Sequence, residues 1–118
     1  MRVFIISLLL ISNLAFAADK EKAYALFKKY GCEGCHADYG IVAGPSFYMV
    51  KSKYLKEFNN DIEATKQYLR ETIRKGSSGK WFKFLDMKMP SHPQIQPEEL
   101  EIIVDWIVSV PPPEEKKK

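Results

Sequence analysis

Two cysteines and one histidine stand close together in the segment Cys32-Glu33-Gly34-Cys35-His36, and these are the only two cysteines of the chain. A Cys-x-x-Cys-His spacing is typical of the attachment of a c-type haem. Each thiol can add across one vinyl group of the porphyrin, and the histidine can then bind the iron from one side. The iron would carry the redox chemistry, while the protein would hold, tune and shield it.

A thiol pair alone permits other interpretations. An exported Cys-x-x-Cys pair can be a disulfide, or the redox pair of a thioredoxin-like strand-helix unit, a setting that this sequence does not show. A structural zinc site usually needs four ligands, and His92 is the only other histidine of the chain. The adjacent His36 favours haem over these alternatives.

The first residues have the pattern of an export signal. Met1-Arg2 gives a positive start, residues 3–16 are almost wholly apolar, and Ala15-Phe16-Ala17 has the small-x-small pattern that signal peptidase cleaves after. An uncleaved membrane anchor is the alternative, but the apolar run is shorter than the roughly 20 residues that span a bilayer. We therefore expect residues 1–17 to be a signal peptide, and the mature protein to be periplasmic with no stable membrane insertion.

The mature chain has a nearly balanced charge. The whole sequence holds 18 lysines and arginines against 15 aspartates and glutamates, and cleavage would remove only Arg2 from these. A net charge of about +2 provides no global basic field for nucleic acid, so charge could guide docking only as a local patch. A chain of about 100 residues makes one small domain, whose apolar core alone gives a modest margin of stability.

Helical periodicity dominates the mature chain, and no run shows convincing strand alternation. The first predicted helix covers residues 20–30, with Asp19 as its N-cap and Gly31 after its end. The second covers about residues 46–56, and Gly44-Pro45 marks its start because proline suits a first helical turn.

Two further helices are predicted in the second half. The third begins at a capping pair of Asn60 and Glu63 and ends before Gly76. Residues 77–96 read as a long loop, interrupted by glycine, serine and proline. The last helix runs from Pro97 to about Val110, and residues 111–118 are expected to be a disordered polar tail. The apolar stripe expected on the third helix consists of Ile62, Leu69 and Ile73.

An iron bound by His36 needs something on its other face. A side chain there would favour electron transfer, whereas an open site would allow small molecules to bind. The candidate donors are Met87 and Met89 in the long loop, Met49 on the second helix, and His92.

Four features in this order resemble the class I c-type cytochromes, especially the small bacterial monohaem proteins. They are the haem motif at residues 32–36, then Gly44-Pro45, then Met89-Pro90, then Trp106 in the last helix. The resemblance extends from about Ala18 to Val110. It implies an all-α fold for residues 18–110, a small cytochrome c-like bundle of about four helices wrapped around one covalently bound haem c.

The resemblance also implies roles for single residues. Cys32 and Cys35 would form the thioethers, His36 would be the proximal ligand, and Met89 the distal one. The Pro45 carbonyl would accept the other imidazole proton of His36. Trp81 would donate a hydrogen bond to a haem propionate. Phe27 and Trp106 would be the aromatic pair where the terminal helices cross.

Two departures from the family pattern affect this assignment. The stretch from Trp81 to Met89 is longer than in the most compact members, and Phe82 stands where a glycine commonly follows that tryptophan. Met87 therefore stays a competitor for the iron. His92 is a weaker one, since we expect it to be an exposed loop histidine.

The function implied is that of a periplasmic electron carrier, not an enzyme, with a His/Met-ligated haem. We expect a monomer that serves redox partner proteins such as a membrane quinol-oxidising complex and a terminal oxidase or reductase, and that binds no nucleic acid. The alternatives are a haem-bearing subunit of a larger periplasmic oxidoreductase and a gas-binding or peroxidatic haem protein. Lysines that could guide acidic partners are Lys28, Lys29, Lys51, Lys53, Lys83 and Lys88.

Overall fold

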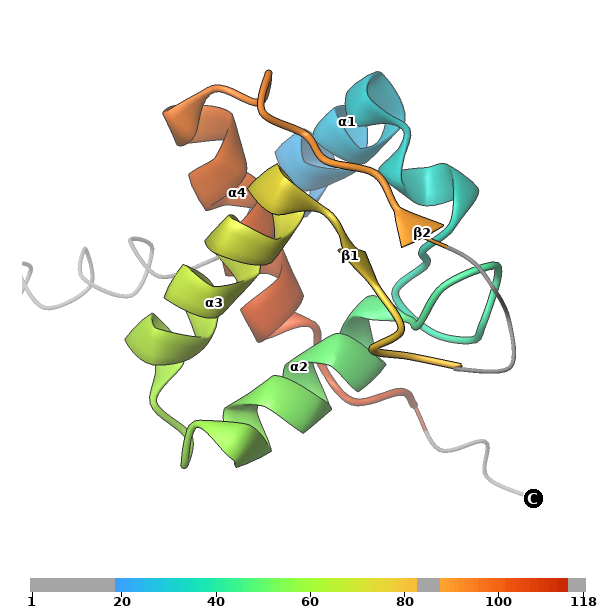
Figure 1. The fold of residues 1–118 in the computed structure, drawn as a ribbon. Coiled ribbons are helices and arrows are strands. Elements are labelled where there is room, and N and C mark those ends of the chain that lie inside the picture. The colour runs from blue at the N-terminus through green and yellow to red at the C-terminus, as the bar shows by residue number, and fades with distance from the viewer. Residues whose placement is uncertain (1–18, 83–87, 115–118) are drawn as a thin grey trace, which may run out of the picture.

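The computed structural model describes residues 19–82 and 88–114 as four α-helices, a 3-10 turn and a two-stranded antiparallel ladder (Figure 1). The helices are α1 (Lys20–Tyr30), α2 (Phe47–Glu57), α3 (Ile62–Lys75) and α4 (Pro97–Ser109). The turn covers Cys32–Gly34, and the ladder pairs β1 (Ser77–Ser78) with β2 (Lys88–Met89). The all-α expectation is confirmed, with this short ladder as an addition inside the predicted loop.

The first and last helices begin where the sequence predicts. The Asp19 carboxylate accepts a hydrogen bond from the Lys22 amide at 3.0 Å, which satisfies one of the unpaired N–H groups of the first turn of α1. Pro97 is the first residue of α4, where its missing N–H costs no helical hydrogen bond. At the same helix start, the Gln96 amide donates to the Glu99 carboxylate at 3.2 Å.

The starts of α2 and α3 lie slightly later than predicted. Ser46 is the N-cap of α2 and accepts a hydrogen bond from the Met49 amide, so Pro45 lies outside the helix. Asp61, not Asn60, caps α3 through the Ala64 amide. The reason is the backbone of Asn60, which has a φ of 65° and belongs to the turn before the helix.

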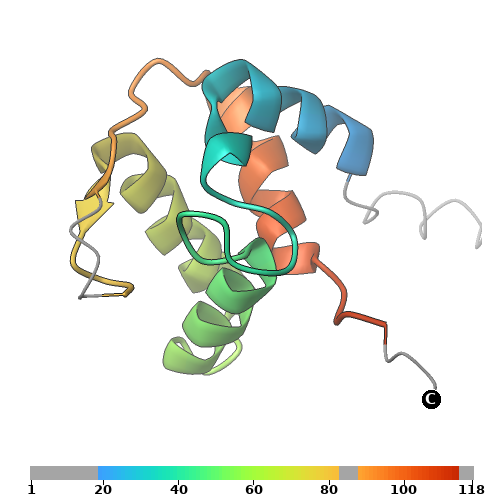
Figure 2. The ribbon, with the colours of Figure 1, turned by 90° about the vertical axis from the view of Figure 1, so that its right-hand side faces the viewer.

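The core forms around α4, which contacts each of the other three helices (Figure 2). Leu69 and Ile73 are buried as predicted, but Ile62 is exposed in the first turn of α3. Thr65 is buried on that helix instead, and its hydroxyl donates to the Asp61 carbonyl at 2.8 Å. The buried apolar residues that α4 contributes are Leu100, Ile103, Val104, Trp106 and Ile107.

The two ends of the chain are predicted to be a signal peptide and a disordered tail. The expected signal peptide, residues 1–17, lies outside the described residues, as do residues 115–118 of the expected tail. Residues 111–114 are exposed and have no regular secondary structure, and the Tyr39 hydroxyl donates to the Pro111 carbonyl at 2.6 Å. Among the residues that the structure describes, no helix is long and apolar enough to cross a membrane.

Candidate functional site

One cavity brings together all six residues predicted for the site. Cys32, Cys35 and His36 contribute to its wall from the segment after α1, Pro45 from the segment just before α2, and Trp81 and Met89 from the segment between α3 and α4. Most of the remaining wall is apolar, including Phe27, Phe47, Val50, Leu69, Ile73, Ile103 and Ile107. Sulfur and imidazole donors therefore face a largely apolar chamber.

The thiol pair lies on a single tight turn. Gly31 ends α1, and the Cys35 and His36 amides both donate to the Cys32 carbonyl, at 3.1 and 2.9 Å. Both thiols are free; Cys32 is half-buried and Cys35 is exposed. Burial raises the pKa of the Cys32 thiol above its usual range. The turn thus holds both sulfurs beside the cavity, with the imidazole directly after them.

The surroundings of the motif lack what two of the alternative interpretations, a thioredoxin-like pair and a structural zinc site, require among the described residues. The thiol pair follows a helix and lies in a 3-10 turn, which is not the strand-helix setting of a thioredoxin-like pair. Within residues 19–82 and 88–114, no three His, Cys, Asp or Glu side chains gather where they could hold a metal ion, so a structural zinc site is not supported there.

His36 has one ring nitrogen already engaged. Its Nδ1 lies 2.7 Å from the Pro45 carbonyl oxygen, which can only accept a hydrogen bond. The proton of a neutral imidazole therefore belongs on Nδ1, and Nε2 keeps the lone pair that a metal needs. The ring also stacks on Phe47, with the ring centres 5.4 Å apart. Position and tautomer of His36 are both set by the protein.

Gly44 allows the backbone to approach this imidazole closely. Its amide donates to the Cys35 carbonyl at 2.7 Å, which folds the chain back onto the haem motif. A Cβ atom at Gly44 would lie 2.8 Å from Cε1 and 3.2 Å from Nδ1 of His36. Real Cβ atoms essentially never come within 3.0 Å of such an atom, so the contact with Cε1 alone requires a glycine unless the imidazole or the loop shifts.

Met89 is half-buried on β2, where it pairs with Ser77 of β1. Gly76 has a φ of 77° and packs so tightly here that a Cβ atom would lie 2.6 Å from the Met89 carbonyl oxygen. The Met89 backbone is therefore seated against the end of α3. Of the other predicted sulfur donors, Met49 is half-buried on α2 and Met87 lies outside the described residues.

His92 is not the exposed loop residue that we expected. It is 8% exposed and lines the same cavity, and its Nδ1 is buried without a hydrogen-bond partner among the described residues. Its backbone amide donates to the carbonyls of Ile73 and Arg74 at 3.1 and 3.2 Å. These bonds attach the residue to the last turn of α3 and account for its burial. Helical periodicity could not show this, because the position lies in a loop.

Trp81 lies in an aromatic and cationic cluster at the cavity. Its ring meets Tyr54 edge-on at 6.2 Å, and the Lys53 ammonium lies 5.0 Å from its centre. Burial, together with a hydrogen bond to Tyr68, raises the pKa of Tyr54, so its phenol stays protonated. Phe82 follows with a φ of 45°, a conformation that glycine adopts more readily. The departure from the family pattern at this position therefore places a large residue in a left-handed conformation.

Phe27 and Trp106 are both buried where α1 and α4 meet, but their closest ring partners are others. Phe27 stacks on Phe47 at 4.6 Å, and Trp106 meets Tyr24 edge-on at 6.0 Å. The expected aromatic crossing of the terminal helices is thus made by Tyr24 and Trp106.

The predicted lysines have different surroundings. Lys29 pairs with Glu99 at 2.9 Å, Lys51 donates to the Val110 carbonyl at 2.7 Å, and Lys53 pairs with Glu57 at 3.7 Å. Lys28 and Lys88 are exposed, and Lys88 lies at the cavity. Lys83 is outside the described residues. Lys28 and Lys88 are therefore the better candidates for meeting an acidic partner.

These residues fit a covalently bound haem. Two free thiols and an imidazole with its Nε2 lone pair available are the donor set that haem c requires, and Gly44 gives that imidazole the room it needs. The apolar wall suits a porphyrin, and Tyr54, Lys80 and Trp81 supply polar groups at the same cavity.

Comparison with known proteins agrees with this chemistry. Residues 21–111 match the family model of cytochrome c. Cytochrome c-551 of Azotobacter vinelandii is 32% identical over 75% of this chain and 98% of its own length, and cytochrome c-551 of Pseudomonas aeruginosa is 29% identical over 85% of each. The crystal structure of Nitrosomonas europaea cytochrome c552 superimposes with a TM-score of 0.61, at 28% identity over 75% of this chain and 99% of that one. The chain is therefore a class I c-type cytochrome, a monohaem electron carrier of the cytochrome c family with a covalently attached haem c.

Proposed function

We propose that this cytochrome is an exported, periplasmic carrier of single electrons whose haem iron is bound by His36 and Met89. One observation carries the proposal. The thiol pair, the imidazole held by Pro45 and the Met89 segment line one cavity, so a porphyrin attached to the thiols would have both donors within the same chamber.

The two ligands suit electron transfer. A bound haem c supplies a reversible one-electron couple. Imidazole and thioether are both neutral, and sulfur favours the ferrous state, so this pair raises the reduction potential. His36 is held by Pro45, and Met89 by the ladder to Ser77. Because both ligands are held before the electron arrives, a change of oxidation state requires little movement of the protein.

The surrounding side chains keep water away from the site. Leu69 is 4% exposed and Ile103 is 1% exposed, and both line the cavity. An apolar wall disfavours the extra charge of the ferric state, which raises the reduction potential further. A covalent attachment also prevents loss of the cofactor after export.

The proposed compartment rests on the expected signal peptide, and the proposed partners rest on the charges exposed at the surface. Residues 1–17 would direct export and be removed. The mature monomer would carry electrons between a membrane quinol-oxidising complex and a terminal oxidase or reductase, through the part of the surface near the thioethers. Exposed Lys28 and Lys88 would attract acidic partners, with a rate that falls as salt rises.

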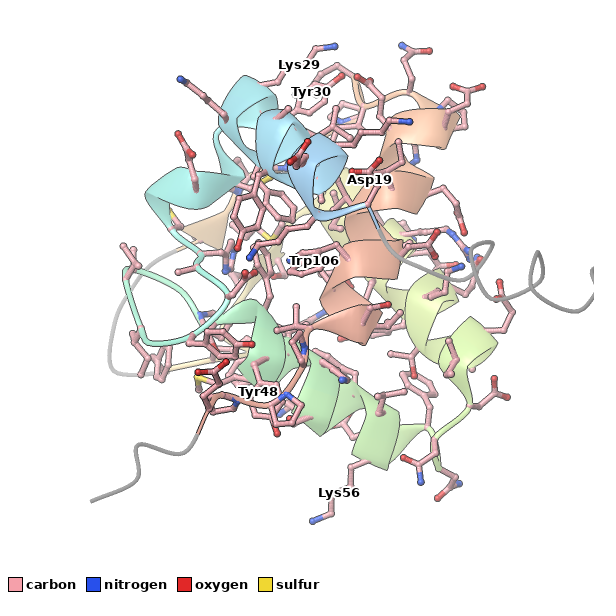
Figure 3. The ribbon with its side chains drawn as sticks, turned by 180° about the vertical axis from the view of Figure 1, so that it is seen from behind. Asp19, Lys29, Tyr30, Tyr48, Lys56 and Trp106 are labelled. Atoms are coloured by element: carbon pink, nitrogen blue, oxygen red, sulfur yellow. The ribbon has the colours of Figure 1, made fainter. Side chains whose placement is uncertain are left out.

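Rapid mixing with membrane fractions tests this function. Reduced mature protein should be reoxidised by membranes at a rate that decreases with ionic strength. Lys88→Gln should lower that rate, because Lys88 is exposed at the cavity, whereas Lys56→Gln should not, since Lys56 points outward from α2 (Figure 3). Rapid binding of carbon monoxide to the ferrous protein would instead indicate an open distal site. Purification in a stable complex with no free monomer would favour the oxidoreductase subunit.

A further inference from the structure

The carboxylate of Asp38 connects the haem-ligand segment to both terminal helices. Asp38 follows His36 by two residues. Its Oδ1 accepts a hydrogen bond from the Trp106 Nε1 on α4 at 2.8 Å, and its Oδ2 accepts one from the Tyr24 hydroxyl on α1. One side chain thus links three parts of the chain that are far apart in sequence.

The donors to Asp38 are themselves held in place. Trp106 is 8% exposed and extends from α4 into the region between α1 and α2 (Figure 3). Its ring meets Tyr24 edge-on at 6.0 Å. Burial, with the Asp38 carboxylate next in importance, raises the pKa of Tyr24 to about 12, so its hydroxyl remains a donor over the physiological pH range.

The backbone around Asp38 carries this restraint towards His36. The Ala37 and Asp38 carbonyls accept hydrogen bonds from the Phe47 and Tyr48 amides, at 2.8 and 3.1 Å. These amides belong to the first turn of α2, where N–H groups lack partners within the helix. Phe47 in turn stacks on the His36 ring. The segment after His36 is therefore attached to α1, α2 and α4 together.

A second cavity lies behind the proximal imidazole. Its walls include His36, Tyr24 and the carboxylate residues Glu33 and Asp38. Without the hydrogen bonds from α1 and α4, the segment that carries His36 would be held beside this space by α2 and by the Pro45 carbonyl. The negative charge of Asp38 also lies on this side of the imidazole.

We propose that Asp38 is a positioning residue for the proximal ligand, and that it fixes the orientation of His36 by holding its segment to the crossing of α1 and α4. This inference rests on the proposed function, because it takes His36 as the iron ligand. Pro45 restrains the imidazole directly, whereas Asp38 restrains the chain on which the imidazole is carried.

Proton NMR of the ferric holoprotein tests this role, because the shifts of the His36 ring protons depend on the orientation of the ring relative to the haem. Tyr24→Phe removes one donor and should shift these resonances. Asp38→Asn should shift them further and raise the reduction potential, since a negative charge that favours the ferric state is lost. Tyr39→Phe is the matched control: it removes the neighbouring hydroxyl, which donates to Pro111, and should leave the resonances and the potential unchanged.

The outcomes separate this inference from the proposed function. Unmoved His36 resonances in folded Tyr24→Phe protein, or shifts equal to those of Tyr39→Phe, would overturn the role of Asp38. If the Asp38→Asn variant cannot be obtained as folded holoprotein, the result for Tyr24→Phe alone decides whether the role of Asp38 stands. The ligand spectrum of the unmodified protein reports on His36 and Met89 independently, so failure of the His/Met proposal would be seen before any variant is made.

Discussion

Gly44→Ala should disturb the proximal ligand through one methyl group. The added Cβ would lie 2.8 Å from Cε1 of His36, and the Cys35 carbonyl oxygen is only 3.3 Å away on another side. The methyl group cannot move freely, because the Gly44 amide is bonded to that same carbonyl at 2.7 Å. Either the imidazole or the loop must shift, and either movement would lengthen the hydrogen bond from Nδ1 of His36 to the Pro45 carbonyl.

The expected change in the free energy of unfolding follows from two opposing effects. Overpacking a well-packed site costs about 1–3 kcal/mol, while replacing glycine stabilises by about 0.4–1 kcal/mol because the unfolded chain loses freedom. The midpoints of these ranges give a net loss of about 1.3 kcal/mol, which lowers the melting temperature of a domain of this size by roughly 5–10 °C.

Thermal unfolding of the holoprotein, followed by circular dichroism, measures this loss. Gly34→Ala is the matched control, because Gly34 belongs to the same haem motif but has no atom within 4 Å of its would-be Cβ. It should change the unfolding free energy by less than about 0.5 kcal/mol. Equal melting temperatures for the two variants would refute the close approach of Gly44 to the imidazole.

The remaining predictions concern charge and the buried histidine. Hydrogen bonds from Arg70 at 2.8 and 3.0 Å, with a smaller contribution from Lys66, lower the pKa of Glu101 to about 2. This group therefore stabilises the fold above its unfolded pKa of about 4.3, and the stabilisation is lost as the pH falls towards 2. In urea unfolding, Glu101→Gln should be less stable than the unmodified protein at pH 6 but nearly equal at pH 2, and equal stability at pH 6 would contradict the pairing of Glu101 with Arg70. His92→Phe removes a buried nitrogen that has no hydrogen-bond partner among residues 19–82 and 88–114, and it should raise the unfolding free energy by about 1 kcal/mol without altering the ligand spectrum; a loss of more than about 2 kcal/mol would show that the nitrogen makes a stabilising bond.

The helices and the site residues near them could be predicted because local chemistry determines them. Asp19 before an apolar stripe, Gly31 after it and Pro97 at a helix start each act within one turn of chain, and the structure has them as predicted. The order of Cys32 to His36, Gly44-Pro45 and Met89-Pro90 resembles that of the class I c-type cytochromes, and this resemblance, not helical periodicity, implies that the three segments meet at one haem; the structure brings them to one cavity.

Contacts between distant segments could not be predicted in this way. His92 is buried because its amide reaches the last turn of α3, which nothing in the loop composition indicates. Ile62 is exposed although its spacing fits the apolar stripe, and Thr65 is buried instead. The bonds from Tyr24 and Trp106 to Asp38 join α1 and α4 to a loop, and no local pattern marks them.

The identity of the distal ligand is the central claim, and the near-infrared band from sulfur to ferric iron tests it most directly. The mature ferric protein should show this band. Met89→Ala should abolish it and lower the reduction potential, whereas Met87→Ala should leave both unchanged. A band that survives in Met89→Ala and disappears in Met87→Ala, or is absent from the unmodified protein, would contradict ligation by His36 and Met89.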